Sequence, residues 1–205
     1  MSVTKTGRPR IKVTVTIDRN EKRPLRFPKT IRWYPSRGAK GQQVLVRTQT
    51  KVLPAGDYAL AGFEDRCIIE RKGSLRELAQ NLLSDDWARA NRAFGKLSLA
   101  TANPYLMLEC TPAELRKAEQ WVQEPARVID ALAALIERFG FRLLLCGSVK
   151  TVQQKQTVGE LMLRLMLAHA YHKEEDYTQC DVVIEKMSSI QGQPGTPTTE
   201  KDAPP

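Results

Sequence analysis

Alternating apolar and polar positions predict β-strands in the first quarter of the chain. Residues 11–18 (IKVTVTID) alternate apolar and polar side chains, which is typical of a strand with one buried face. The stretch 21–28 (EKRPLRFP) is interrupted by prolines and is predicted to be a loop. Residues 42–53 (QQVLVRTQTKVL) favour a short strand or an irregular extended segment.

A turn and two further strands are predicted next. Residues 54–57 (PAGD) have the composition of a turn. Residues 57–63 (DYALAGF) and 66–72 (RCIIERK) are each apolar enough to form a strand, and the second should be central and buried on both sides. We expect the two strands to form a hairpin around residues 62–65.

From Ser74 the apolar spacing changes to three and four residues, which predicts helices. Ser74 suits an N-cap and Glu77 follows three positions later, which is the pattern of a capping box. A second helix is predicted over residues 87–99. Its basic residues recur at three- and four-residue spacing and should form one face, made of Arg89, Arg92 and Lys96.

The remaining chain alternates strands with helices. Residues 105–110 (YLMLEC) and 141–147 (FRLLLCG) predict strands, and the latter should be covered on both faces. Residues 125–139 predict an amphipathic helix that ends at Gly140, and residues 152–172 predict a long final helix. This order indicates one α/β domain with a mixed central sheet flanked by helices.

The chain divides into three predicted parts. Residues 1–10 form a basic flexible arm and residues 11–187 the folded domain. Residues 188–205 are rich in Pro, Gly, Thr and Gln, which predicts a disordered tail. The length of 205 residues is enough for one substantial domain.

Charge and cysteine content narrow the class of protein. The net charge of +9 favours a polyanionic partner, nucleic acid before an anionic membrane. No apolar run could span a bilayer, and no secretory signal begins the chain. The cysteines form no C-x-x-C pair of the kind that would indicate a zinc site. We expect them to be reduced, in a cytoplasmic protein of a bacterium or a phage-infected host. The four cysteines are Cys67, Cys110, Cys146 and Cys180.

The residues that suggest chemistry are Asp57 and, thirteen positions later, Glu70-Arg71-Lys72. Side chains alternate faces along a strand, so Glu70 and Lys72 share one face and Arg71 points to the other. A neighbouring strand could bring Asp57 beside Glu70. Two clustered carboxylates repel each other unless a cation lies between them, and Mg²⁺ prefers such oxygen ligands. Taken alone, an E-x-K pattern is more often a surface ion pair on an edge strand.

Three segments in this order resemble the XPF-type nuclease family of the PD-(D/E)-x-K group. They are VTIDRNEKRPLRFP, LPAGDYAL and CIIERKGSLRELAQNL, at residues 15–28, 53–60 and 67–82. The family pattern is D-x-R-E, then G-D, then E-R-K; here Asp18 and Glu21 match its outer acids. The resemblance spans roughly residues 12–173 and implies a restriction-endonuclease-like fold. Because no helix-hairpin-helix module follows, the chain resembles the short single-domain members of phages and prophages.

The resemblance implies a metal-dependent DNA endonuclease, acting on branched, flap or duplex DNA. It assigns Asp57, Glu70 and Lys72 to catalysis, with Mg²⁺ or Mn²⁺ bound by Asp57 and Glu70. Asp18 and Glu21 would bind a second metal or hold the waters bound to the first. Asn20 stands where the family usually has Arg, and Arg76 where it often has an acid, which leaves the predicted metal ligands unchanged.

Other residues carry open alternatives. Arg71 could bind DNA phosphate or pair with a carboxylate, and the basic face of residues 89–96 could bind the DNA backbone or be merely solvated. We interpret Glu109 as a surface residue, although it falls at a Glu of the family pattern. His169 and His172 are interpreted as a solvated helix end before a metal pair, and the three tryptophans, Trp33, Trp87 and Trp121, as core or interface residues.

Two rival functions and one assembly state also follow from the sequence. A catalytically inactive, nuclease-like DNA-binding subunit would usually lack the acids present here. A basic scaffold that binds protein partners would show no affinity for nucleic acid at moderate salt. The resemblance implies a possible homodimer, because family members commonly pair through the nuclease domain. An apolar stripe on the last helix could serve that dimer or simply the core: Leu161, Leu165 and Ala168.

Overall fold

The computed structural model describes residues 10–36, 38–84, 87–117 and 124–171. In this part of the chain, seven strands form one sheet in the order β2-β3-β1-β4-β5-β6-β7. The strands are β1 (Arg10–Asp18), β2 (Thr30–Trp33), β3 (Gln42–Lys51), β4 (Tyr58–Leu60), β5 (Ile68–Lys72), β6 (Pro104–Leu108) and β7 (Arg142–Leu145). The helices are α1 (Leu75–Leu83), α2 (Trp87–Ala100), α3 (Pro125–Phe139) and α4 (Val152–Tyr171), with a 3-10 turn at Glu114–Arg116.

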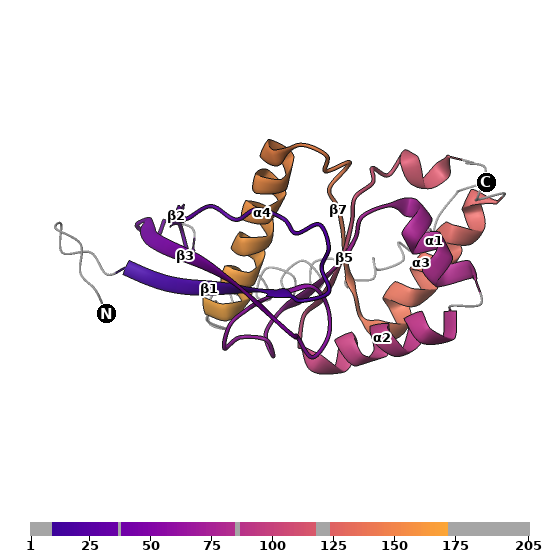
Figure 1. Cartoon of the computed structure of the whole chain (residues 1–205), viewed down its shortest axis with the longest axis horizontal. Coiled ribbons are helices and arrows are strands. Elements are labelled where there is room, and N and C mark those ends of the chain that lie inside the picture. The colour runs from indigo at the N-terminus through magenta and orange to yellow at the C-terminus, as the bar shows by residue number, and fades with distance from the viewer. Residues whose placement is uncertain (1–9, 37, 85–86, 118–123, 172–205) are drawn as a thin grey trace, which may run out of the picture. The chain divides into compact units, whose positions relative to one another are not determined.

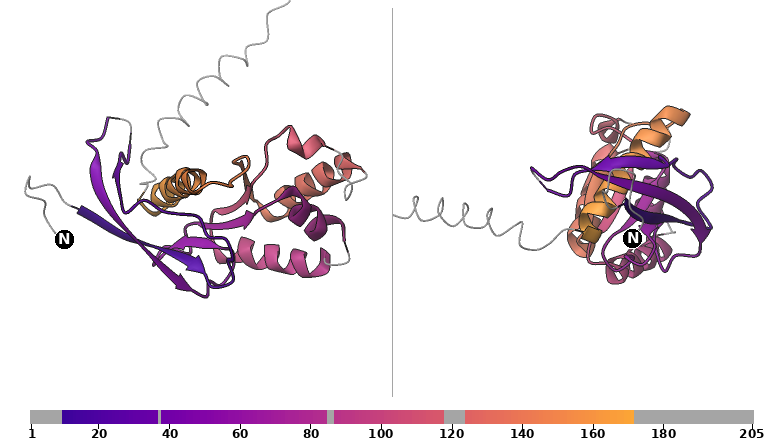
Figure 2. Two further views of the ribbon diagram at one scale, coloured as in Figure 1. Left: turned by 45° about the horizontal axis from the view of Figure 1, so that its top comes forward. Right: turned by 90° about the vertical axis from the view of Figure 1, so that its left-hand side faces the viewer.

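The sheet is mixed, as the sequence predicts. β3 and β1 run parallel over nine residue pairs and lie side by side in Figure 2. β4 is antiparallel to both β1 and β5, which confirms the predicted hairpin. β5, β6 and β7 are mutually parallel neighbours. β5 is therefore a central strand with a partner on either side.

Two cores lie on opposite faces of the sheet, and strand alternation assigns side chains to them. Ile69 packs in the core that includes α4, whereas Ile68 packs in the core formed with α1, α2 and α3. Figure 1 shows α4 on one side of β5 and the other three helices on the other side. By the same alternation, Arg71 belongs to the α4 face, and Glu70 and Lys72 belong to the opposite face.

Three strand predictions need correction. β2 was not predicted, because its four residues, TIRW, are too few to show a period. β3 is a ten-residue strand rather than a short one, since β1 pairs with it along its length. β7 is not covered on both faces: it lies at the sheet edge, and Arg142 and Leu143 are exposed.

The helix ends largely follow the predicted signals. Ser74 caps α1 by accepting the Glu77 amide at 3.2 Å. The Glu77 carboxylate accepts the amide of Gly73, one residue before the cap, so the capping box is shifted by one position. Gly140 ends α3 in the left-handed region, with φ of 65°, which glycine adopts without steric cost.

The outer parts of the predicted domain are only partly described. Arg10 is the first residue of β1 rather than the last of a flexible arm, while residues 1–9 lie outside the described residues. Helix α4 ends at Tyr171, and both the remainder of the predicted domain and the predicted tail lie outside them as well. No helix in the described ranges is long and apolar enough to cross a membrane.

Candidate active site

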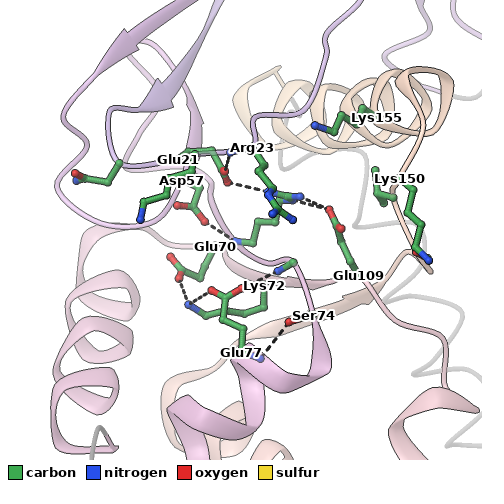
Figure 3. A pocket seen from close by; sticks show the side chains of 16 residues that line it. Glu21, Arg23, Asp57, Glu70, Lys72, Ser74, Glu77, Glu109, Lys150 and Lys155 are labelled. Atoms are coloured by element: carbon green, nitrogen blue, oxygen red, sulfur yellow. Dashed lines mark hydrogen bonds and ion pairs between the residues drawn. The ribbon is translucent and has the colours of Figure 1, made fainter.

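A cavity of about 750 Å³ lies where several elements meet. It is lined by the loop after β1, the turn before β4, the end of β5, the start of α1, the end of β6 and the segment that leads into α4. Three predicted catalytic residues, Asp57, Glu70 and Lys72, line it together (Figure 3). The structure therefore brings the separated G-D and E-R-K segments to one place.

Asp57 is held at the cavity by backbone hydrogen bonds to β1 and β5. Its amide donates to the Ile69 carbonyl at 2.9 Å, and its carbonyl accepts the Asp18 amide at 2.8 Å. Its carboxylate Oδ2 accepts the Arg71 amide at 2.7 Å. Burial, followed by the negative charge of Glu70, raises the pKa of Asp57 to about 8.

The residue before Asp57 is a glycine for a steric reason. Gly56 has φ of +69°, and a Cβ there would lie 2.5 Å from Ile68 Cγ2. A larger residue would strain the turn and push it away from β5. The G-D pair is therefore one unit, in which the glycine allows the close approach that places the carboxylate.

Lys72 lies next to Glu70 on the face opposite α4. Its Nζ is 2.7 Å from Glu70 Oε1 and 3.5 Å from Glu77 Oε1. Its Nζ also lies 5.7 Å from the centre of the Phe94 ring. Burial lowers the pKa of Lys72, but Glu70 and Glu77 outweigh that effect and raise it. Lys72 is thus a charged ammonium beside the predicted metal ligands.

Arg71 forms a buried charge network on the other face. Its Nη1 is 3.1 Å from Glu21 Oε2, and its Nη2 is 2.5 Å from Glu109 Oε1. All three side chains are less than 10% exposed, at 6%, 8% and 7%. Of the two alternatives for Arg71, the structure shows carboxylate pairing. Our interpretation of Glu109 as a surface residue is wrong, because its side chain lines the cavity and is buried against Arg71.

The two acids that follow β1 have other partners. Asp18 does not line the cavity; its two carboxylate oxygens accept the amides of Asn20 and Leu53, each at 2.8 Å. The predicted role of Asp18 at a second metal or at the waters of the first needs correction, because both carboxylate oxygens instead fix the backbone at the end of β1. Glu21 lines the cavity, but its oxygens are engaged by Arg71 and by the Arg23 amide. Glu21 therefore supports the site through Arg71.

The predicted basic face of α2 lies away from this cavity. Arg89, Arg92 and Lys96 are all exposed, and none lines the cavity. Several cavity residues that were not predicted as site residues come from the loop after β1 and from the segment at the start of α4. They are Asn20, Lys22, Arg23, Ser148, Lys150 and Lys155. No local pattern marks them, since their proximity depends on where α4 packs.

Other predicted residues are structural. Cys67 and Cys110 are buried free thiols and Cys146 is a half-buried one, as predicted; Cys180 lies outside the described residues. Trp33 is buried in the core that includes α4, and Trp87 is half-buried against the core on the opposite face of the sheet. Trp121 lies outside the described residues.

Two predictions concern α4. His169 is half-buried with Nε2 at 3.0 Å from the Tyr105 hydroxyl, so it is not simply solvated, and His172 lies outside the described residues. Leu161 and Ala168 are exposed and Leu165 is half-buried, so a dimer through this stripe stays a prediction.

The carboxylates at the cavity suit a hydrated divalent cation. Mg²⁺ is commonly bound by one or two carboxylates and keeps several waters. Asp57 and Glu70 supply two carboxylates, and burial followed by the charge of Glu70 raises the pKa of Asp57, so a cation bound by both would favour the ionised form. Among the described residues, no three or more His, Cys, Asp or Glu form a ready-made metal cluster. The fit is therefore to a partial shell completed by water and substrate.

The comparison with known families decides the classification. The family model of the ERCC4 domain matches residues 17–157, more than half of the chain. The chain belongs to the ERCC4-domain family. The matched range of this ERCC4 domain includes Asp57, Glu70, Arg71, Lys72 and Glu109. The predicted resemblance to XPF-type nucleases is confirmed.

Solved structures agree with the fold of this ERCC4 domain. The chain is similar to XPF from Aeropyrum pernix, with 22% identity and a TM-score of 0.51 over 88% of this chain and 75% of that one. The chain is also similar to the structure titled XPF from Aeropyrum pernix, complex with DNA. That comparison gives 23% identity and a TM-score of 0.51 over 90% of this chain and 76% of that one. No curated protein sequence matches. At this identity the likeness shows the fold, and it confirms the predicted nuclease-like α/β class.

Proposed function

We propose that this ERCC4-domain protein is a metal-dependent DNA endonuclease that prefers branched or flap DNA. The observation that carries the proposal is the convergence of Asp57, Glu70 and Lys72 on one cavity. Two carboxylates and an ammonium beside an open cavity suit phosphodiester hydrolysis, which needs a bound cation, an oriented water and compensation of phosphate charge. The DNA complex of the similar Aeropyrum pernix XPF supports DNA as the substrate.

Each residue has a role in the proposed reaction. Asp57 and Glu70 would hold Mg²⁺, or Mn²⁺ in its place. When bound, this ion polarises the phosphate and lowers the pKa of a water. Lys72 orients the attacking water and offsets charge on the phosphate. The Arg71 amide fixes the Asp57 carboxylate, and the Arg71 side chain ties the loop after β1 to the end of β6.

The test uses labelled duplex, flap and four-way-junction DNA with Mg²⁺, Mn²⁺ or EDTA. Asp57→Asn and Lys72→Met remove one charge each and nearly keep side-chain shape, so they test chemistry rather than folding. The matched controls are Asp65→Asn and Lys40→Met, at exposed positions outside the cavity. We expect the wild type and the controls to cleave DNA when Mg²⁺ or Mn²⁺ is present and EDTA to stop cleavage. Both site variants should cleave at least about a hundredfold more slowly than the wild type.

The same experiment separates the rival functions. If wild type binds every DNA but cuts none with either metal, the chain is a catalytically inactive DNA-binding subunit. If it neither binds nor cuts DNA at moderate salt, a protein-binding scaffold becomes the better explanation. If it cuts duplex as fast as flap and junction DNA, the proposed structure preference is wrong while the nuclease activity stands.

A further inference from the structure

Four basic side chains lie on the rim of the cavity and come from two distant parts of the chain. Lys22 and Arg23 lie in the loop after β1, Lys150 lies just before α4, and Lys155 lies near the start of α4. Lys22, Arg23 and Lys150 are exposed, and Lys155 is half-buried. Figure 3 shows Lys150 and Lys155 on the α4 side of the cavity.

These rim residues differ from the inner cations in their partners. Arg71 and Lys72 are each within 4 Å of carboxylates, which neutralise them. Within the described ranges, none of the four rim side chains has a carboxylate within 4 Å. The rim therefore carries positive charge that faces the cavity and is available to an anion.

The backbone fixes the two rim segments against each other. The Arg26 amide donates to the Lys155 carbonyl at 3.3 Å, and a Cβ on Gly159 would lie 2.1 Å from the Arg26 carbonyl oxygen. The Leu25 amide donates to the buried Tyr58 hydroxyl at 3.0 Å. The rim is thus held in place without a ligand, which reduces the entropy lost on binding one.

The position of Lys150 is fixed in a similar way. Gln154 Oε1 accepts the amides of Lys150 at 3.0 Å and of Thr151 at 2.9 Å. The Gln154 amide in turn donates to Thr151 Oγ1 at 3.1 Å. This reciprocal cap sets where the chain enters α4, and so keeps the Lys150 backbone beside the cavity.

We propose that Lys22, Arg23, Lys150 and Lys155 form a phosphate track that holds the backbone of one DNA strand beside Asp57. The proposal rests on the proposed function in taking DNA as the ligand. No aromatic side chain is among the described residues that line the cavity, so base stacking has no platform there. The track contacts phosphates and does not read sequence. It replaces the α2 face as the expected backbone contact, because that face does not border the cavity.

The test compares two charge-neutralising double variants of the full chain. Lys150→Gln with Lys155→Gln alters the rim, and Arg92→Gln with Lys96→Gln removes the same charge from α2. Binding to labelled duplex and flap DNA is measured by fluorescence anisotropy in EDTA over a series of salt concentrations. Each lost phosphate contact lowers the salt slope by about 0.9. The salt slope is the steepness with which the logarithm of the binding constant falls with the logarithm of the salt concentration. We expect the rim variant to reduce this slope by about 2 on DNA of every sequence, and the α2 variant to leave it unchanged.

The outcomes distinguish the track from the nuclease activity. A rim variant with the slope and affinity of wild type overturns the track, as does an α2 variant that loses as much. Wild type that binds no DNA in EDTA also overturns it. If the rim variant shows the lowered slope but wild type cuts no DNA with Mg²⁺ or Mn²⁺, the track stands and the proposed activity fails. If wild type cuts and the slope does not change, the activity stands and the track fails.

Discussion

Replacing Asp57 by asparagine removes a carboxylate whose charge the folded, metal-free protein disfavours. Burial and then the charge of Glu70 raise the pKa of Asp57 from 3.8 to about 8. The asparagine Oδ1 can still accept the Arg71 amide, as the Asp57 carboxylate does. The variant therefore keeps the local geometry while losing the unfavourable charge.

The sign and size of the stability difference between wild type and Asp57→Asn follow from proton linkage. Below pH 4 both folded and unfolded states hold the proton, so the favourable effect of the raised pKa is fully present. Between pH 4 and 8 the unfolded state loses the proton first, and the contribution of Asp57 to folding stability falls as pH rises. One pH unit corresponds to about 1.4 kcal/mol, so from pH 5 to pH 7 wild type should lose about 2 to 3 kcal/mol relative to the Asn variant.

The measurement is urea unfolding of both proteins at several pH values in EDTA. The difference between the two stability curves isolates Asp57, because all other titrating groups are shared. Parallel curves would refute the reasoning and show that Asp57 is already ionised in the metal-free fold. Adding Mg²⁺ should stabilise wild type most at high pH and leave Asp57→Asn unchanged, since the cation binds the ionised carboxylate.

Three further predictions concern the supports of the site. Glu109→Ala leaves buried Arg71 partly unpaired and should reduce the free energy of unfolding by about 3 kcal/mol, against about 0.5 or less for exposed Glu137→Ala, measured in urea. Gly56→Ala should reduce the free energy of unfolding by about 1 to 3 kcal/mol, measured by thermal melting, and should lower the rate of DNA cleavage at the same time. Gly159→Ala, beside the Arg26 carbonyl, should lower thermal stability similarly; an unchanged melting temperature would contradict that contact.

The sequence determined the local parts of the candidate site. The two-residue period of a strand was enough to place Glu70 and Lys72 on one face and Arg71 on the other, and the apolar run before them indicated a central strand. Helix boundaries followed from Ser74 and Gly140, because capping is a property of adjacent residues. Family resemblance, rather than spacing, identified Asp57 as their partner.

Tertiary structure decided which distant segments meet. The order of the strands places the end of β6 next to β5, which buries Glu109 against Arg71. The packing of α4 against the loop after β1 brings Lys150 and Lys155 to the cavity and leaves the α2 basic face outside it. Asp18 likewise became a backbone anchor because Leu53 lies within its reach. A one-dimensional pattern records which face a side chain takes on its own element, but not which elements pack together across the sheet.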